Sequence, residues 1–302
     1  MTDFINRLKY KYKNGNLLIK LIFINAVIFF ILAIIGVFAK LFNIYQLNLI
    51  PFVGVPSDTS LLIRRFWTPL TYMFVHVDFL HILFNMLWLY WFGKISLQYF
   101  SGRVLGSLYV LGGLAGALLF IIAFNTIPYY VNMQRDWSVL GISPPLIGAS
   151  AAVMAIVMGA AFYRPDVHVN LLFLGSIKIV YIAIAVFVLD FLALGNDTNP
   201  GGHIAHIGGG LLGYFFAIQY KKGRDITGWM SKIIDWFTNL FKRSRKSKMK
   251  VTYRKTESDA DYNARKHNEQ DEIDIILDKL KQSGYSSLSS DEKKKLFDAS
   301  KK

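Results

Sequence analysis

Six stretches of about 20 mostly apolar residues constrain the fold of this chain more than any other feature. They lie at residues 17–39, 70–93, 103–125, 146–162, 177–195 and 201–220. A helix of about 20 apolar residues matches the thickness of a bilayer core. Composition agrees, because hydrophobic residues make up 53% of the chain and charged residues only 18%, below the soluble average of about a quarter. The sequence therefore predicts an all-α membrane protein with six transmembrane helices.

The chain divides into a membrane part and a tail. We expect a basic N-terminus over residues 1–16, a membrane domain over 17–220, a basic interfacial helix and flexible linker over 221–270, and a small helical hairpin over 271–302. The first apolar run is too long for a cleavable signal peptide and lacks a small-residue cleavage site, so we expect it to remain as a helix.

Lysine and arginine are distributed unevenly and predict the orientation in the membrane. The formal net charge is +14, and 21 of the 34 Lys and Arg residues lie in residues 221–302. Because Lys and Arg near membrane ends mark the cytoplasmic side, we expect both termini to be cytoplasmic, which an even number of helices allows. Three basic residues fall in the cytoplasmic turns of this scheme: Lys94, Arg103 and Arg164. Three others fall outside and oppose it: Arg64, Arg65 and Arg135.

The basic tail favours the lipid bilayer over nucleic acid as its partner. A cytoplasmic flank rich in Lys and Arg is attracted to anionic headgroups, which explains the charge without nucleic acid. One face of residues 226–241 is apolar and predicts an interfacial helix; it carries Trp229, Ile233, Trp236, Phe237 and Leu240. In the hairpin, Ser289 and Glu292 form a capping box that would begin the last helix. Two short helices bury little surface alone, so this segment is open to an unidentified partner.

Ser150 and His206 are polar residues inside predicted membrane helices, each on a face of small residues. Polar groups at membrane depth are rare and by default mark functional sites. Gly148 lies beside Ser150, whereas Gly209 and Gly213 continue the face of His206. Such small residues let two helices approach closely, as a serine–histidine hydrogen bond requires. We interpret Ser150 as a nucleophile and His206 as its base; alternatively, Ser150 bonds a backbone carbonyl and His206 merely packs.

The second apolar run supplies three further polar residues, His76, His81 and Asn85. His81 and Asn85 are four residues apart and share a helical face. Acyl transfer needs hydrogen-bond donors for the oxyanion of its tetrahedral intermediate, and asparagine or histidine side chains can donate to it. We expect His81 and Asn85 to form this oxyanion site; the alternative is a hydrogen-bonded pair that holds helices together.

The histidines also suggest a metal or haem site. Four of the six, His76, His81, His203 and His206, lie in predicted membrane helices, and imidazole is a common ligand. However, no glutamate accompanies His203 and His206 in a metalloprotease pattern, and no carboxylate cluster is evident near them. We interpret Asp190 in the fifth run as a structural hydrogen-bonding residue. We therefore expect neither a metal nor a cofactor.

Together these motifs resemble the rhomboid intramembrane serine proteases. The likeness covers residues 60–220 and rests on His81 to Asn85, on Gly148 to Ser150, and on His206 with the glycines that follow it. The final hairpin resembles the C-terminal appendage of some bacterial members. The resemblance implies a six-helix core in a bacterial inner membrane. Its implied substrates are transmembrane proteins, cut near the outer end of a helix that can unwind.

The resemblance also implies roles for individual residues. Ser150 would be the nucleophile and His206 its general base, with no acidic third residue. His81, Asn85 and the Ser150 backbone amide would form the oxyanion site, and His76 would help to hold water. The implied activity is that of a serine endopeptidase without cofactors.

The chain departs from the family pattern beside the serine. Ala151 stands where the family usually has glycine, so we expect looser packing but retained activity. Met154 stands where an aromatic residue often stacks on the histidine, and its sulfur would partly replace that contact. A non-catalytic relative that binds membrane helices is the main alternative, but such relatives typically lack the serine or the histidine, and this chain keeps both.

Overall fold

The computed structural model describes residues 6, 10, 12, 14–44, 47–139, 144–171, 175–195, 199–241 and 259–300. The chain forms two compact units, Met1–Arg243 and Ser244–Lys302.

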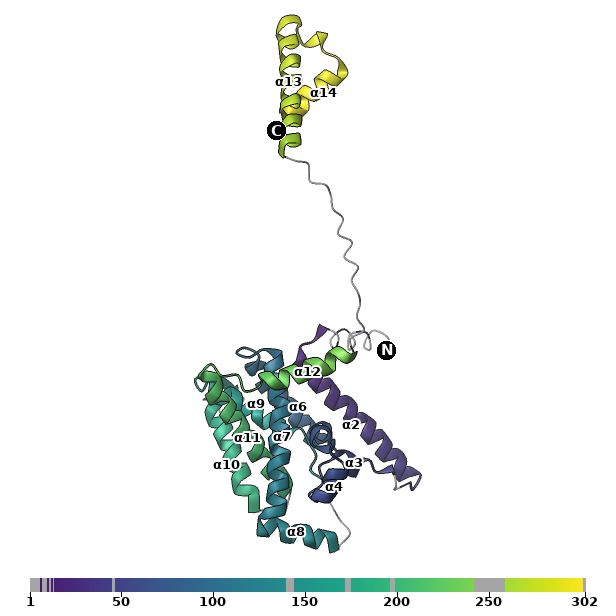
Figure 1. The fold of residues 1–302 in the computed structure, drawn as a ribbon, viewed down its shortest axis with the longest axis vertical. Helices are drawn as coiled ribbons and strands as arrows, with labels where there is room; N and C mark the ends of the chain where they lie inside the picture. Colours follow the sequence, from purple (N-terminus) through teal and green to yellow (C-terminus); the bar gives the residue numbers. More distant parts are fainter. Residues whose placement is uncertain are drawn as a thin grey trace. The chain divides into compact units, whose positions relative to one another are not determined.

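The first unit is a helical bundle whose main helices follow the six apolar runs (Figure 1). These helices are α2 (Leu17–Leu41), α6 (Phe79–Ser96), α7 (Gly102–Thr126), α9 (Ser150–Tyr163), α10 (Ile179–Leu192) and α11 (Pro200–Lys221). Among the described residues, α2 and α7 are long and apolar enough to cross a membrane, and a bent pair ending in α6 would make a third span. α9 and α10 are shorter apolar helices. The prediction of an all-α membrane bundle is confirmed.

Helix α9 forms the centre of the bundle. All residues from Ala151 to Ala161 are buried, as expected for a helix that is apolar on every side. Helices α11, α7, α6 and α10 pack around it. Helix α2 lies obliquely at the edge of the bundle and exposes Phe30, Ile34 and Val37 (Figure 1). Such exposed apolar surface suits contact with lipid.

The second apolar run is not one helix, contrary to the prediction of a continuous helix over residues 70–93. α5 (Thr68–Thr71) and the 3-10 turn η2 (Tyr72–Phe74) come first, and α6 starts only at Phe79, bent by 93° from them. Val75 is extended, and the carbonyl of Tyr72 accepts hydrogen bonds from the amides of both Val75 and Gly148. Hydropathy could not predict this break, because a valine in an extended linker is as apolar as a valine in a helix.

The fourth run begins its helix at Ser150 rather than at residue 146. Leu146 pairs with Val55 through two backbone hydrogen bonds of 2.9 and 2.8 Å, which holds this stretch extended. Gly148 has a φ of +118°, a conformation that L side chains rarely adopt. Gly148 therefore lies in the turn before α9, and the prediction that it packs on a helix face is wrong.

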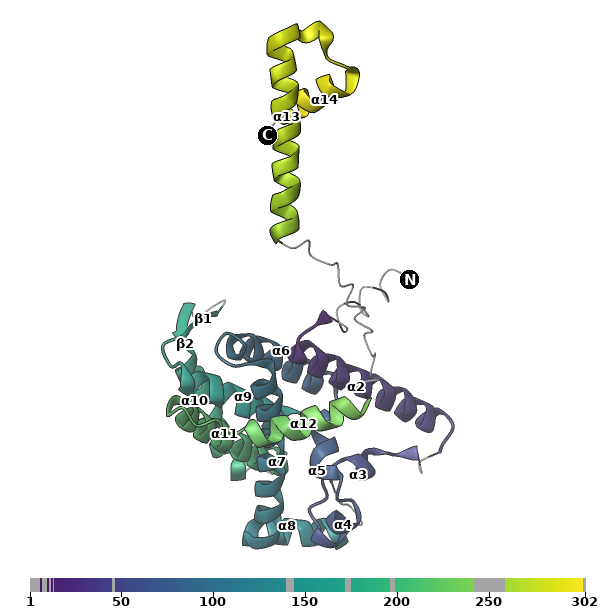
Figure 2. The same ribbon diagram turned by 45° about the horizontal axis from the view of Figure 1, so that its top comes forward.

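Shorter elements connect the main helices. In sequence, α3 (Ile50–Val53) and α4 (Thr59–Arg64) lie between α2 and α5, and α8 (Pro128–Val139) follows α7. Between α9 and α10, β1 (His168–Leu171) and β2 (Gly175–Lys178) form an antiparallel hairpin in which His168 pairs with Lys178 (Figure 2). Among the described residues, this hairpin and the pairing of Val55 with Leu146 are the β-structure of the first unit.

Helix α12 (Gly228–Phe241) crosses the bundle at the N-terminal end of α7 (Figure 2). The hydroxyls of Ser107 and Ser231 lie 2.8 Å apart, and Met230 is buried. Trp229, Ile233 and Trp236 are exposed, as expected for an interfacial helix. The side chains of Phe237 and Leu240, predicted on the same face, lie outside the described residues.

The second unit contains α13 (Asp259–Ser283), the 3-10 turn η4 (Tyr285–Ser287) and α14 (Ser290–Ser300). α13 begins earlier than the predicted hairpin, so residues 259–270 are helical, not part of a linker; the remaining linker, 242–258, lies outside the described residues. The capping box is confirmed, since Ser289 and Glu292 exchange two hydrogen bonds. A hydrogen bond from Lys279 lowers the pKa of Glu292 to about 2, so this carboxylate stays charged at neutral pH.

The contact between α9 and α11 depends on glycine. A Cβ atom added at Gly209 or Gly213 would overlap the carbonyl oxygen of Ala151 or Ala155. The two helices therefore touch backbone to backbone, as small residues allow in membranes. Helix α11 is thereby held against the first turns of α9.

Gly213→Ala is expected to destabilise the bundle, because its methyl group would have to displace the backbone of α9. Overpacking of this kind typically costs about 1–3 kcal/mol, so the thermal midpoint of the detergent-solubilised protein should fall. Gly36→Ala is the matched control: Gly36 is also helical, but a Cβ there meets nothing within 4 Å. A Gly213→Ala protein as stable as the Gly36→Ala protein would contradict the packing described.

Candidate active site

Ser150 is the first residue of α9, and contacts from the broken second run fix the turn before it. The Gly148 amide donates to the Tyr72 carbonyl at 3.0 Å, and the Ala149 amide donates to Nε2 of His76 at 3.3 Å. The first amides of a helix lack partners within that helix, and the helix dipole places partial positive charge there. The serine hydroxyl thus lies at an end of a helix that favours negative charge.

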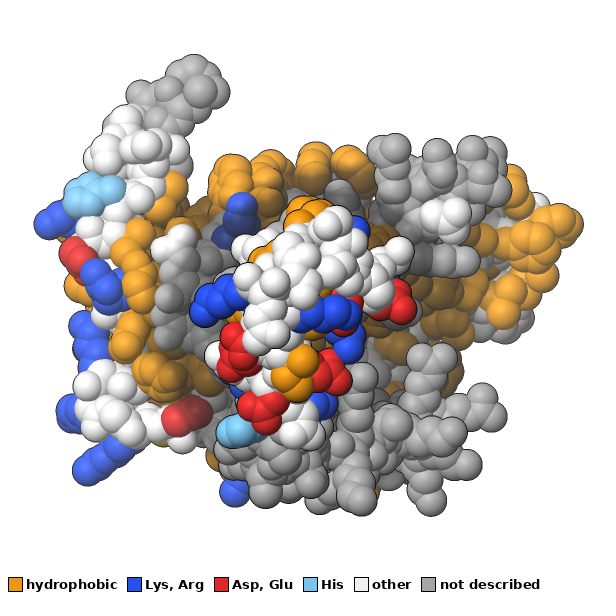
Figure 3. All heavy atoms as spheres, turned by 90° about the horizontal axis from the view of Figure 1, so that it is seen from above, with side chains coloured by type: hydrophobic (Ala, Val, Ile, Leu, Met, Phe, Trp, Pro, Cys, Tyr) orange, Lys and Arg blue, Asp and Glu red, His pale blue; other side chains and the backbone are white. Residues whose placement is uncertain are grey.

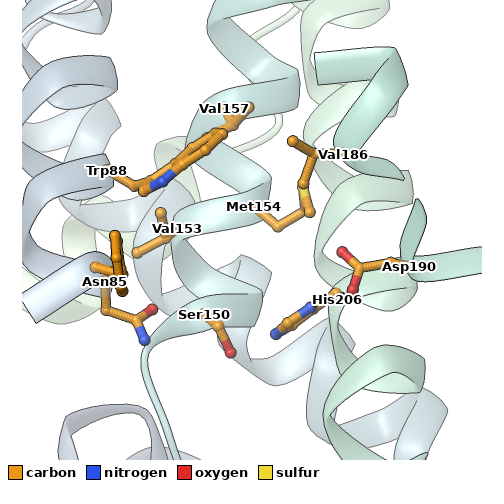
Figure 4. Close-up of a pocket in the computed structure, with 10 residues that line it drawn as sticks. Asn85, Trp88, Ser150, Val153, Met154, Val157, Val186, Asp190 and His206 are labelled. Carbon is orange, nitrogen blue, oxygen red and sulfur yellow. Dashed lines mark hydrogen bonds and ion pairs between the residues drawn. The ribbon is translucent and has the colours of Figure 1, made fainter. Parts of the chain in front are cut away.

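His206 reaches the same place from α11. In the close-up, the side chains of Ser150 and His206 point toward one another, with one ring nitrogen of His206 on the Ser150 side (Figure 4). Both residues are half-buried and line one cavity of about 230 Å³. Residues 56 positions apart in sequence therefore line the same cavity of the bundle.

The wall of this cavity is mostly apolar. Six apolar side chains from α6, α9 and α10 line it: Phe84, Trp88, Val153, Met154, Val157 and Val186. The polar residues are Asn85, Ser150, Asp190 and His206. A cavity with a few convergent polar groups in an apolar wall has the composition of a binding site.

Asn85 and His81, the predicted oxyanion residues, lie near Ser150. Asn85 is buried, lines the 230 Å³ cavity and donates one Nδ2–H to the carbonyl of His81 at 2.9 Å. An amide group has two N–H bonds, so one remains available. The His81 ring lies against Gly148: a Cβ there would come within 2.8 Å of His81 Cε1 and 3.7 Å of Ser150 Oγ. The glycine is needed for this approach.

His81 also lines a second cavity, of about 540 Å³. Its wall includes Asp78, the stretch from Pro144 to Ile147 before α9, and Asn199 to Gly202 at the start of α11. This second cavity therefore lies at the N-terminal ends of α9 and α11, whereas the first extends along α9.

His76 supports the backbone beside the serine. Its side chain is 1% exposed, and its Nε2 accepts from the Ala149 amide. Its ring meets that of His81 edge-on, with 5.1 Å between centroids. Its Nδ1 has no hydrogen-bond partner among the described residues. This contact fixes the turn before Ser150. The role expected for His76 was to hold water, and the sequence did not predict a contact with the backbone.

Asp190 is the residue whose position the sequence analysis missed. Its Oδ1 lies 2.8 Å from Nδ1 of His203 and 2.9 Å from Nδ1 of His206. One carboxylate therefore lies beside the two histidines, where the sequence led us to expect no carboxylate cluster and, from the resemblance, no acidic third residue; Asp190 does form hydrogen bonds, as expected. Asp190 precedes the two histidines by 13 and 16 residues, and only the turn between α10 and α11 brings it back to them. Its isolated charge in an apolar helix was the available signal.

These three residues have the donor types of a metal site, and their ligand atoms lie within 4.8 Å of one another. The nitrogen-to-oxygen separations are those of direct hydrogen bonds. A proton on each Nδ1 accounts for the arrangement without a metal.

The unusual Ala151 is accommodated by the neighbouring helix. Its side chain is buried against α7, where a Cβ added at Gly116 would lie only 2.6 Å from the Ala151 Cβ. Gly116 on α7 therefore leaves room for the methyl group that Ala151 has and a glycine would lack. Met154 lines the cavity one turn after Ser150.

Comparison with known proteins identifies the family. A model of the rhomboid domain matches residues 64–222, more than half of the chain. A family of unknown function (DUF6576) matches residues 256–302, which include α13 and α14.

A relative from Arabidopsis thaliana, "RHOMBOID-like protein 12, mitochondrial", is 30% identical over 167 residues. The match covers 53% of this chain and 48% of the relative, so the chain spans about half the length of that protein. From the rhomboid-domain match and the helical membrane bundle, the chain belongs to the rhomboid family.

Proposed function

We propose that this rhomboid-family membrane protein is a serine endopeptidase that cuts transmembrane proteins. The observation that carries the proposal is that Ser150 and His206 face one another in a single cavity (Figure 4). In the proposed reaction, Ser150 Oγ attacks the scissile carbonyl carbon while Nε2 of His206 takes the hydroxyl proton. His206 then returns that proton to the leaving amine as the peptide C–N bond breaks, and water hydrolyses the acyl-enzyme ester.

The tetrahedral intermediate carries a negative oxygen that needs donors. The free N–H of Asn85, the His81 ring and the Ser150 amide are the proposed donors, each brought near Ser150 by the contacts described above. Hydrogen-bond donors that already point at the developing charge stabilise the transition state strongly in an apolar site, because they do not have to reorient during the reaction. The N-terminal end of α9 adds its dipole to them.

The two cavities suggest separate routes for peptide and water. The 230 Å³ cavity has the apolar wall that an unwound membrane segment would require, and His81 faces the larger cavity at the helix ends. His206 is six residues into α11, roughly 9 Å from its start at 1.5 Å per residue. Ser150 itself starts α9, so the shallow position of the site follows from α11 and not from a helix that begins at residue 146. We infer cleavage in the outer part of the substrate helix.

Surface charge supports the proposed orientation. The C-terminal ends of α6, α9 and α11 lie at one end of the bundle, and Lys and Arg side chains lie along the left edge of the view from that end (Figure 3). Exposed basic residues at this end include Lys94, Arg103, Lys178, Lys221, Lys222 and Arg224. At the opposite end, Arg65 is engaged by the Pro51 carbonyl and the Phe52 ring. We propose cytoplasmic termini and a bacterial inner membrane as the location.

Substituting the dyad tests the enzyme assignment. Ser150→Ala and His206→Ala should each remove nearly all cleavage of a transmembrane model substrate in proteoliposomes, and the double variant should be little worse, because the two groups act as a unit. A serine-directed fluorophosphonate should label the wild type and not Ser150→Ala.

His203→Ala is the matched control, since it removes the neighbouring histidine of the same helix. It should cleave far faster than His206→Ala, although it loses the hydrogen bond between His203 and Asp190. If His203→Ala is inactive while His206→Ala cleaves, the base has been misassigned; if Ser150→Ala still cleaves and the wild type takes no label, the protein is a non-catalytic relative.

Asn85→Ala should lower kcat far more than it changes KM, because the donor acts mainly on developing charge. Loss of one oxyanion donor costs about 10²–10³-fold in kcat in a well-studied protease. His81→Ala should act in the same direction. An unchanged kcat for Asn85→Ala, with chemistry rate-limiting, would leave Asn85 as a residue that only holds helices together.

Product termini will locate the cut. Mass spectrometry of both fragments should place the scissile bond in the outer third of the substrate helix, and helix-breaking residues there should speed cleavage by freeing its carbonyls. The control is the same substrate with those residues moved to its inner third. A cut in the cytoplasmic third would contradict the proposed orientation or depth.

A further inference from the structure

We propose that Asp190 is a positioning residue that holds His206 in the tautomer able to accept the proton of Ser150. The proposal rests on the proposed protease function. It adds to the serine and histidine a carboxylate on a third helix, α10.

The geometry of the His206 ring carries the argument. Its Nδ1 lies 2.9 Å from Asp190 Oδ1, and its other nitrogen lies on the Ser150 side (Figure 4). A neutral imidazole carries one proton, and a carboxylate can only accept. The hydrogen bond therefore puts the proton on Nδ1 and leaves the Nε2 lone pair free for the serine hydroxyl. It also fixes the rotation of the ring.

The surroundings strengthen this hydrogen bond. The Asp190 side chain is 10% exposed, in a helix whose other residues are all uncharged. A carboxylate at membrane depth requires donors, and the same Oδ1 accepts from Nδ1 of His203 at 2.8 Å. His203 thus orients the carboxylate from the preceding turn of α11, while the carboxylate orients His206.

The developing charge gives the carboxylate a further effect. When Ser150 transfers its proton, His206 becomes a cation inside a mostly apolar wall. A charge in such surroundings is costly unless an opposite charge lies beside it. Asp190 supplies that charge without taking the proton, as the acidic member of a serine triad does.

Asp190→Asn keeps the size of the side chain and removes its charge. Its amide can donate to Nδ1 and so favour the wrong tautomer, with the proton on Nε2. We expect kcat to fall by about 10²–10⁴-fold, the upper figure being that of the same change in a soluble triad. KM and the thermal midpoint should change little, and the fluorophosphonate should label Ser150 correspondingly slowly.

The tautomer can be read directly by NMR of protein labelled with ¹⁵N-histidine. His206 in the wild type should be protonated on Nδ1, and Asp190→Asn should move the proton to Nε2; His203→Ala, which removes the other hydrogen bond to the same oxygen, should keep the wild-type tautomer. A structural residue would shift the thermal midpoint in Asp190→Asn and leave kcat and the tautomer of the folded protein unchanged, which would overturn the proposal.

Three further outcomes are distinguishable. Inactive Ser150→Ala and His206→Ala together with fully active Asp190→Asn would reject the role of Asp190 and leave the protease proposal standing. Active Ser150→Ala would reject the protease itself. Incubation of the wild type with EDTA should leave activity intact; loss of activity that Zn²⁺ restores would show that Asp190, His203 and His206 hold a metal, and would also overturn the proposal.

Discussion

The backbone contact between α9 and α11 is the constraint on which the rest of the structure depends. Gly209 and Gly213 let the peptide backbones of the two helices touch beside Ala151 and Ala155. Within a bilayer there is little hydrophobic drive to join helices, so close packing has to supply the association. That contact sets the separation between the helix that carries the serine and the helix that carries the histidines.

Around this contact, several polar groups of the bundle are held by neighbours on other elements. Asp190 receives two imidazole donors, His76 receives the Ala149 amide, and the Tyr72 carbonyl receives the Gly148 amide. Such partners reduce the cost of polar groups in apolar surroundings. The polar residues of α6, α10 and α11 and of the linker before α6 therefore form one connected arrangement around the first turn of α9.

The sequence predicted the helical class because apolar runs of about 20 residues have the length of a membrane-spanning helix. The motif residues around Ser150 and His206 were also identifiable, since polar residues with small neighbours are conspicuous in such runs. The break at Val75 and the extended stretch before Ser150 were not predicted, because both depend on hydrogen bonds between distant segments: Leu146 with Val55 and Gly148 with Tyr72. Asp190 was recognisable as a lone charge in an apolar run, but its hydrogen bonds to His203 and His206 depend on how α10 packs against α11.

In the proposed protease, the separation of the two cavities would affect the order of events in the reaction cycle. A peptide segment lying along α9 would fill the apolar cavity, whereas the cavity lined by His81 lies at the helix ends and stays outside that track. Solvent would then approach the acylated serine from the side opposite to the bound chain. Deacylation would not have to wait for the remaining fragment to diffuse away into lipid, so chemistry and product escape could proceed independently of one another.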